Sequence, residues 1–260
     1  MNPIIETILK RKSVRAYEKK AVPAEVRQEL LQATLRAPTA GNLMLYSILE
    51  VTDQSVKEEL AKTCDNQPFI ARAPLVWLFL ADYQRWFDYF QACGVEQLCG
   101  QNGVPMRKPQ EGDLFLACCD AIIAAQTTVL AAESLGLGSC YIGDIMENYE
   151  IQRDLLALPP YTFPICLLCF GYPTRQQKER EQTPRFGEKF ILFENRYRRL
   201  NQADFDEMFR ETHTQTFRGR EELAGAHNMG QLIYTRKFNA DFSKEMTRSV
   251  REILKGWLQE

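Results

Sequence analysis

Two arginines and a serine near the N-terminus have the spacing of an anion clamp. Arg11, Ser13 and Arg15 follow a predicted helix that begins near residue 2. In an extended segment the three side chains project to one side, because side chains alternate with period two. Guanidinium groups bind phosphate through paired hydrogen bonds. The alternative is that the basic residues at 10–12 only complement the negative end of the helix dipole, with Arg15 in solvent.

The sequence lacks the motifs of several other familiar cofactor, metal and catalytic sites. GLGSCYIG follows a helix and has Tyr141 where the dinucleotide fingerprint needs its third glycine. No G-x-x-x-x-G-K-[ST] or H-E-x-x-H motif occurs, so neither a phosphate loop nor a metal site is predicted. The two histidines, His213 and His227, lie in the tail, so no Ser–His or Cys–His pair can be assembled from the body. This pattern favours an organic cofactor as the carrier of the reaction.

The composition excludes several classes of protein. With 45% hydrophobic residues, 25% charged residues and a net charge of −2, nothing attracts the chain to nucleic acid or to a membrane surface. No uncharged apolar run reaches about 20 residues, so we expect no membrane span. The charges near the N-terminus follow the apolar residues, the reverse of a secretory signal. The eight cysteines are then expected to be reduced, buried hydrophobes in a cytoplasmic protein.

The stretch from Asp113 to Asp144 organises the rest of the chain. It begins with about two dozen residues that include neither Gly nor Pro and are dominated by Ala, Leu and Ile. One helical face is predicted at Leu116, Cys119, Ile123, Ala124, Thr127, Leu130, Ala131 and Leu135. Apolar residues also lie off that face, so we expect a helix with little contact with water. A short strand, SCYIG, follows, and its end is a predicted place for a ligand.

Apolar runs separated by helical segments predict an α/β (α+β) fold. Strands are expected at 45–51, 74–82, 139–143 and 162–173, and an amphipathic helix at about 241–258. The loop around Cys93 to Lys108 is long enough for a lid or a substrate wall. Residues 175–199 are markedly basic. We expect one domain over 1–200 and a C-terminal helical extension with a basic mobile loop over 201–260, as part of the same fold unit.

Several motifs in order resemble the nitroreductase superfamily. They are RKSVRAY at 11–17, APTAGNLMLYSILEV at 37–51, AAESLGLGSCYIGD at 131–144, FPICLLCFGYP at 163–173, TPRF at 183–186 and LFENRY at 192–197. ADYQRW at 81–86 and the extended tail are most similar to the NADPH-dependent branch, the oxygen-insensitive nitroreductases and NADPH–flavin oxidoreductases. The resemblance implies an FMN-binding fold over 1–200, with a central mixed sheet wrapped by helices, in an intertwined homodimer that holds FMN at its interface.

The resemblance also implies roles for individual residues. The phosphate and ribityl chain of FMN would be held by the N-terminal segment, namely Arg11, Lys12, Ser13 and Arg15. The flavin of the partner chain would reach the turn formed by Pro38, Thr39, Ala40, Gly41 and Asn42. The amides of Asn66 and Gln67 would suit the oxygens and N3 of the flavin ring. In the C-terminal phosphate segment Arg185 is retained, but Thr183 stands where the family has lysine, which leaves Lys178 or Arg180 as substitutes.

The turn that faces flavin N5 in the family corresponds to Tyr141, Ile142, Gly143 and Asp144. A backbone N–H from this turn would bond N5, and Gly143 would allow the close approach. Asp144 replaces a second glycine, which puts acceptor range and redox tuning in question. No protein side chain is implied as catalytic, because the flavin carries the chemistry.

The implied activity is hydride transfer from NADPH or NADH through flavin N5 to a nitroaromatic, quinone or flavin acceptor, in a ping-pong cycle. An arginine loop in the tail would bind the 2′-phosphate of NADPH, with Arg218 and Arg220 as candidates. Two alternatives stay open: an FMN-binding protein with little turnover, and a nucleic-acid-binding module that uses the basic segment 175–199. Interleaved glutamates and the lack of stacking aromatics argue against the second alternative.

Overall fold

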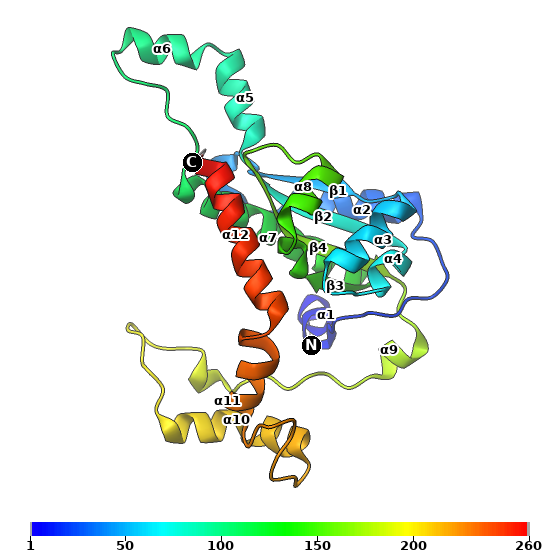
Figure 1. Ribbon diagram of the computed structural model, residues 1–260. Helices are drawn as coiled ribbons and strands as arrows, with labels where there is room; N and C mark the ends of the chain where they lie inside the picture. Colours follow the sequence, from blue (N-terminus) through cyan, green and yellow to red (C-terminus); the bar gives the residue numbers. More distant parts are fainter. Residues whose placement is uncertain (1, 259–260) are drawn as a thin grey trace. The chain divides into compact units, whose positions relative to one another are not determined.

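The computed structural model describes residues 2–258. The chain forms two compact units, one of residues 2–180 and 245–258 and a second of residues 181–244. The first unit contains a sheet and most of the helices (Figure 1). The predicted boundary near residue 200 and the predicted mobility of the basic loop stay predictions.

The helices of the first unit are α1 (Pro3–Lys10), α2 (Ala24–Thr34), α3 (Gln54–Thr63), α4 (Phe69–Arg72), α5 (Gln84–Ala92), α6 (Val95–Gln101), α7 (Glu111–Ser134), α8 (Tyr149–Leu156) and α9 (Arg175–Glu179), with short 3₁₀ turns η1 (Ala40–Asn42) and η2 (Asp144–Met146). The strands are β1 (Tyr46–Glu50), β2 (Leu75–Asp82), β3 (Gly138–Ile142) and β4 (Thr162–Gly171). The last helix, α12 (Asp241–Leu258), begins in the second unit and continues through the first.

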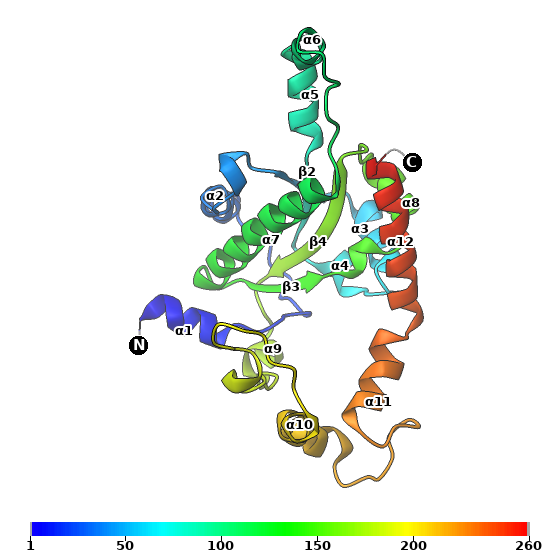
Figure 2. The same cartoon turned by 90° about the vertical axis from the view of Figure 1, so that its left-hand side faces the viewer.

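The α/β fold class is confirmed. The sheet has the order β1-β2-β4-β3, and each neighbouring pair is antiparallel. Within residues 2–258, the one parallel pairing that gives the sheet the predicted mixed character is an isolated bridge between Ser13 and Ser139. All eight residues of β2 are buried, as the continuous apolar run predicts for a central strand. Helices α2 and α7 cover one face of the sheet, and α3, α4 and α8 lie on the other (Figure 2).

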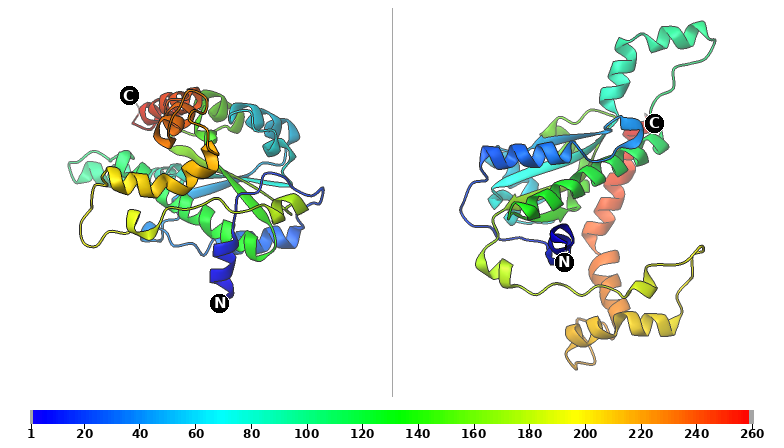
Figure 3. Two further views of the ribbon diagram at one scale, coloured as in Figure 1. Left: turned by 90° about the horizontal axis from the view of Figure 1, so that it is seen from below. Right: turned by 180° about the vertical axis from the view of Figure 1, so that it is seen from behind.

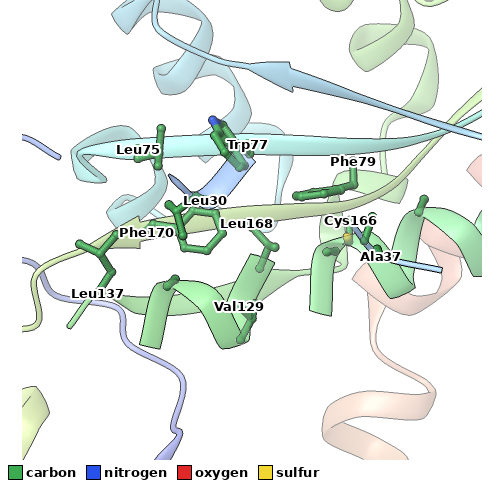
Figure 4. Packing of buried hydrophobic residues seen from close by; sticks show 14 of the residues in the cluster. Leu30, Ala37, Leu75, Trp77, Phe79, Val129, Leu137, Cys166, Leu168 and Phe170 are labelled. Atoms are coloured by element: carbon green, nitrogen blue, oxygen red, sulfur yellow. The ribbon is translucent and has the colours of Figure 1, made fainter. Parts of the chain in front are cut away.

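Helix α7 buries one of its apolar sides against the sheet, and much of the predicted apolar face lies on the other side. Its buried side chains are Leu114, Ala117, Asp120, Ala121, Ala124, Ala125, Thr128, Val129 and Ala132. In contrast, Leu116, Cys119 and Ile123 of the predicted face are exposed. Figure 4 shows Val129 of α7 in the main core, which also contains Leu168 and Phe170 of β4 and Trp77 of β2. The helix is apolar on two sides, so periodicity alone could not identify the side that meets the sheet.

Two features complete the first unit. Helices α5 and α6 extend away from the sheet as an arm (Figure 1), where the sequence predicts a long loop after an aromatic helix start. Helix α2 packs alongside α7 (Figure 3).

By length and composition α7 could cross a membrane, a property that buried helices of soluble proteins share, and 44% of its most apolar window is buried.

The second unit is helical within the residues described. It contains η3 (Glu188–Phe190), α10 (Gln202–Phe217), α11 (Met229–Ile233) and a π-helical turn, η4 (Tyr234–Phe238). Its small core consists of Phe217, Ala226, Met229 and Leu232.

Candidate functional site

The N-terminal anion clamp lies against the first residues of β3. Helix α1 ends at Lys10, and the chain then runs extended, with the Val14 amide donating to the Ser139 carbonyl at 2.8 Å. A Cβ on Gly138 would lie 2.5 Å from Val14, so only glycine lets the two segments pack this closely. The predicted extended segment is therefore present, and β3 holds it in place.

Three guanidinium groups converge beside this contact. The charges of Arg11, Arg15 and Arg180 all act on the Cys140 thiol, which Arg15 also hydrogen-bonds. Burial raises the pKa of Cys140 while the three arginines oppose that rise. Arg180 donates to the Ser13 carbonyl at 2.5 Å. Of the two substitutes considered for the lysine replaced by Thr183, Arg180 thus bonds the clamp directly.

The Lys12 side chain bonds to backbone carbonyls, whereas the family resemblance implies that it binds the FMN phosphate. Its ammonium donates to the carbonyls of Lys178, at 2.7 Å, and of Arg180. The side chain of Gln177 accepts a hydrogen bond from the Arg15 amide at 3.3 Å. These contacts tie the segment 177–180 to the clamp. Lys178 itself pairs with Glu18 at 3.2 Å, so its charge is partly neutralised.

A buried carboxyl group lies behind the clamp. Glu133, near the end of α7, has one oxygen buried without a hydrogen-bond partner. Burial raises its pKa to about 7, and the charges of Arg11 and Lys12 oppose the rise. Because Glu133 is partly protonated at neutral pH, it cancels less of the positive charge of the clamp than an ionised glutamate would.

The turn at 38–42 is fixed by a side chain that sequence reasoning missed. Asp120 of α7 is buried and accepts from the amides of Ala40, at 2.9 Å, and Leu45, at 3.1 Å. Gly41 and Asn42 have positive φ angles of 56° and 58°, which glycine and asparagine tolerate better than other residues. An aspartate inside an otherwise apolar helix was the available signal.

The turn and the clamp lie far apart within one chain. Asp120 marks the turn and Glu133 marks the clamp, and both belong to α7. Thirteen residues of helix separate them, which corresponds to about 20 Å. The structure therefore does not bring Pro38, Thr39, Gly41 and Asn42 together with the clamp in a single protomer.

Gln67 and Asp144 do meet, from segments 77 residues apart. The Gln67 side-chain NH2 donates to an Asp144 carboxylate oxygen at 2.7 Å and to the Cys64 carbonyl at 3.0 Å. Asn66 lies in an exposed left-handed turn with φ of 51°. Two of the predicted positions, 67 and 144, are thus in direct contact.

The segment from 141 to 143 ends β3 as predicted. Ile142 is buried, and the Tyr141 hydroxyl donates to Gln126 at 3.3 Å. Gly143 has an ordinary φ of −79°, and an added Cβ would meet only the Met146 side chain, at 4.0 Å. Neither backbone conformation nor crowding by the protein requires glycine here, so its small size leaves space that the described residues do not fill.

A second missed residue, Glu147, lies beside Asp144. It is 3% exposed, hydrogen-bonds the Asp144 carboxyl, and has one buried oxygen without a partner. Burial, and then the charge of Asp144, raise its pKa to about 8. Glu147 consequently keeps its proton at neutral pH and can donate it to the Asp144 carboxylate.

The remaining predicted residues belong to the second unit. Arg185 is exposed and donates to the Pro184 carbonyl at 3.5 Å. Arg218 ends α10 in a left-handed conformation, and Arg220 follows two residues later; both are exposed. Their roles toward phosphate groups stay predictions.

The family comparison shows to which family the chain belongs. The model of the nitroreductase family matches residues 8–172, which include the clamp, the turn and the pair of Gln67 and Asp144. The chain belongs to the nitroreductase family. This confirms the resemblance on which the residue assignments rest.

Relatives with known activities are similar over most of this nitroreductase-family chain. An oxygen-insensitive NADPH nitroreductase of Salmonella typhimurium is 31% identical, over 81% of this chain and 82% of the relative. An FMN reductase (NADPH) of Bacillus subtilis is 31% identical over 79% and 78%. An NADPH-flavin oxidoreductase of Vibrio harveyi is 31% identical over 78% of each chain.

Solved structures agree with this fold. Nitroreductase A of Vibrio parahaemolyticus has a TM-score of 0.80 and 26% identity, with 97% of each chain covered. The NADPH:FMN oxidoreductase of Vibrio harveyi, solved with NAD+, has a TM-score of 0.76 and 27% identity, covering 97% of this chain and 98% of that one.

Proposed function

We propose that the protein is an FMN-dependent oxidoreductase that uses NADPH or NADH to reduce nitroaromatic, quinone or flavin acceptors. The observation that carries the proposal is the extended segment of Arg11, Ser13 and Arg15 held along β3, with Arg180 bonded to its Ser13 carbonyl, in a chain of the nitroreductase family. Guanidinium forks match the geometry of a phosphate monoester such as the one FMN carries.

The residues present fit FMN at two places. The clamp supplies cations for the phosphate, with Arg11, Ser13 and Arg15 as ligands and Lys12 as the tether of 177–180. The space beside Gly143 suits close approach of a flat ring. The chemistry that FMN supplies when bound is hydride exchange at N5, first with the pyridine nucleotide and then with the acceptor, in a ping-pong cycle.

The protein itself contributes charge and orientation. The arginines neutralise the phosphate and so fix one end of the cofactor. The backbone of Tyr141, Ile142, Gly143 and Asp144 and the amides of Asn66 and Gln67 face the ring in this assignment. The contribution to rate is then orientation and removal of water, with no side-chain acid, base or nucleophile required.

The proposal includes a homodimer with FMN at its interface. The support is an exposed apolar surface on α1 and α7, which includes Ile4, Ile8, Phe115, Leu116 and Ile123, each at least 40% exposed. A cavity of about 470 Å³ lies between the two helices. A dimer also explains why the turn at 38–42 lies about 20 Å from the clamp, because that turn would serve the site of the partner.

Further assignments extend the proposal. Arg185 would assist at the phosphate and Arg218 and Arg220 would bind the 2′-phosphate of NADPH. Residues 201–260 would form an extension of the FMN-binding domain. We also propose a cytoplasmic location, for which the eight free cysteines are the support.

Titration with FMN and a turnover assay together test the proposal. We expect the purified protein to bind FMN and to oxidise NADPH with a quinone or nitrofurazone as acceptor. Arg15→Ala should lose FMN, while Arg175→Ala, a change of an exposed arginine nearby, should not. Bound FMN that NADPH cannot reduce would favour the alternative of an FMN-binding protein without turnover. A protein that binds no FMN at all would refute the proposal.

A further inference from the structure

Asp144 stands where the family resemblance predicts a second glycine in the turn that faces the flavin. Its side chain makes specific contacts. Its carboxylate accepts from the Gln67 side-chain NH2 at 2.7 Å. The second hydrogen of that NH2 is directed to the Cys64 carbonyl at 3.0 Å. Both hydrogens of the Gln67 amide are therefore in use.

These contacts fix which end of the Gln67 amide points where. The nitrogen and oxygen of an amide are normally assigned from the surrounding hydrogen bonds. The Cys64 carbonyl can only accept, and so can an ionised Asp144. The NH2 group must consequently face both of them, and the Gln67 carbonyl oxygen must point away.

The carbonyl oxygen of Gln67 is left available. It accepts no hydrogen bond from the part of the chain that the structure describes. Gln67 is only partly buried, so the oxygen has access to a ligand. An amide oxygen held in this way offers an acceptor, which suits a ring N–H and disfavours a ring carbonyl.

Glu147 offers Asp144 a second hydrogen-bond donor. Its carboxyl group hydrogen-bonds Asp144, and its pKa, raised to about 8 chiefly by burial, leaves it protonated at neutral pH. Three further groups face Glu147: the carboxylates of Asp65 and Glu245, and the thiol of Cys64. Glu245 is paired with Arg248 at 2.8 Å, so its own charge is compensated. Asp144 thus receives a hydrogen bond from each side.

We propose that Asp144 is a positioning residue that orients the Gln67 amide, so that the site presents a hydrogen-bond acceptor to the imide N–H of the flavin ring. This inference rests on the proposed FMN-dependent function. It adds a role for Asp144, through Gln67, at the position where the family resemblance has a second glycine.

A double-mutant cycle tests the coupling between the two residues. The affinity of the apoprotein for FMN is measured by quenching of flavin fluorescence for the wild type, Asp144→Ala, Gln67→Ala and the double variant. We expect Asp144→Ala to raise the Kd for FMN about tenfold, the size of one well-formed hydrogen bond. In the Gln67→Ala background the same change should alter the Kd less than about twofold, because the residue through which it acts is gone.

Two matched variants separate orientation from charge and from folding. Asp144→Asn keeps an acceptor oxygen that can bond the Gln67 NH2, so its Kd should stay within about threefold of wild type. Asp65→Asn removes a nearby negative charge and keeps a residue that tolerates the left-handed backbone, φ 54°; its Kd should not change. Circular dichroism confirms that each variant is folded.

The results that would overturn the inference are distinct from failure of the proposed function. Asp144→Ala with wild-type affinity, an undiminished effect in the Gln67→Ala background, or an equal loss in Asp144→Asn would each refute the positioning role. FMN binding by the wild type would leave the proposed function standing in all three cases. A wild type that binds no FMN would instead refute both.

Discussion

Replacing Glu147 with glutamine should remove a pH-dependent loss of stability. The pKa of Glu147 is raised from 4.5 to about 8, first by burial and then by the charge of Asp144, with Asp65 and Glu245 adding to it. In the unfolded chain the carboxyl loses its proton near pH 4.5. In the folded protein it keeps the proton until about pH 8.

The sign follows from proton binding. Between pH 4.5 and 8 the folded state holds one more proton than the unfolded state, so the free energy of unfolding falls as the pH rises. Each pH unit corresponds to about 1.4 kcal/mol, which makes the full loss at most about 5 kcal/mol. Glutamine is neutral in both states, so the free energy of unfolding of Glu147→Gln should not fall in this window. The difference in free energy of unfolding between Glu147→Gln and the wild type should therefore grow from pH 4.5 to 8 and stay constant above about pH 8.

Urea unfolding of the apoprotein at several pH values between 5 and 9 measures this difference. Glu29→Gln is the control, because Glu29 is an exposed glutamate on α2. Its curve should run parallel to that of the wild type. If the curve of Glu147→Gln also ran parallel to the wild type between pH 5 and 8, Glu147 would be ionised in the folded protein and the argument would be wrong.

Four further changes have expected outcomes. Arg180→Ala should raise the Kd for FMN about tenfold or more, because it removes a charged donor that lies beside the clamp; an unchanged Kd in fluorescence titration would exclude Arg180 from the site. Asp120→Ala should lower the free energy of unfolding by about 3 kcal/mol in urea, since one buried and one partly buried amide lose their acceptor, and a loss below about 1 kcal/mol would contradict this. Ile123→Lys should shift the protein from dimer to monomer in sedimentation while Ile151→Lys, on α8, should not; equal masses would refute the assigned interface. Arg218→Ala should raise the KM for NADPH and spare that for NADH, and equal effects on both would show that the tail assignment is wrong.

Local patterns allowed part of the site to be predicted. The end of α1 and the extended run through Arg11, Ser13 and Arg15 depend on neighbours in sequence, and the structure has both. The strands were also predictable, because continuous apolar runs such as 75–82 are typical of buried strands.

The rest depends on contacts between distant segments. Arg180 reaches Ser13 from 167 residues away, and Gln67 reaches Asp144 from 77. No periodicity reveals such pairs. The side of α7 that meets the sheet could not be predicted for a related reason: Leu116 and Ala117 are both apolar, and only the presence of the sheet decides which is covered.

Anaerobic reduction of the FMN-loaded protein by NADPH tests the central claim most directly. The account predicts that the protein binds one FMN per chain and that NADPH bleaches the flavin absorbance, which a quinone then restores. A protein that stays colourless in the presence of FMN, or a bound flavin that NADPH and NADH both leave oxidised, would contradict it.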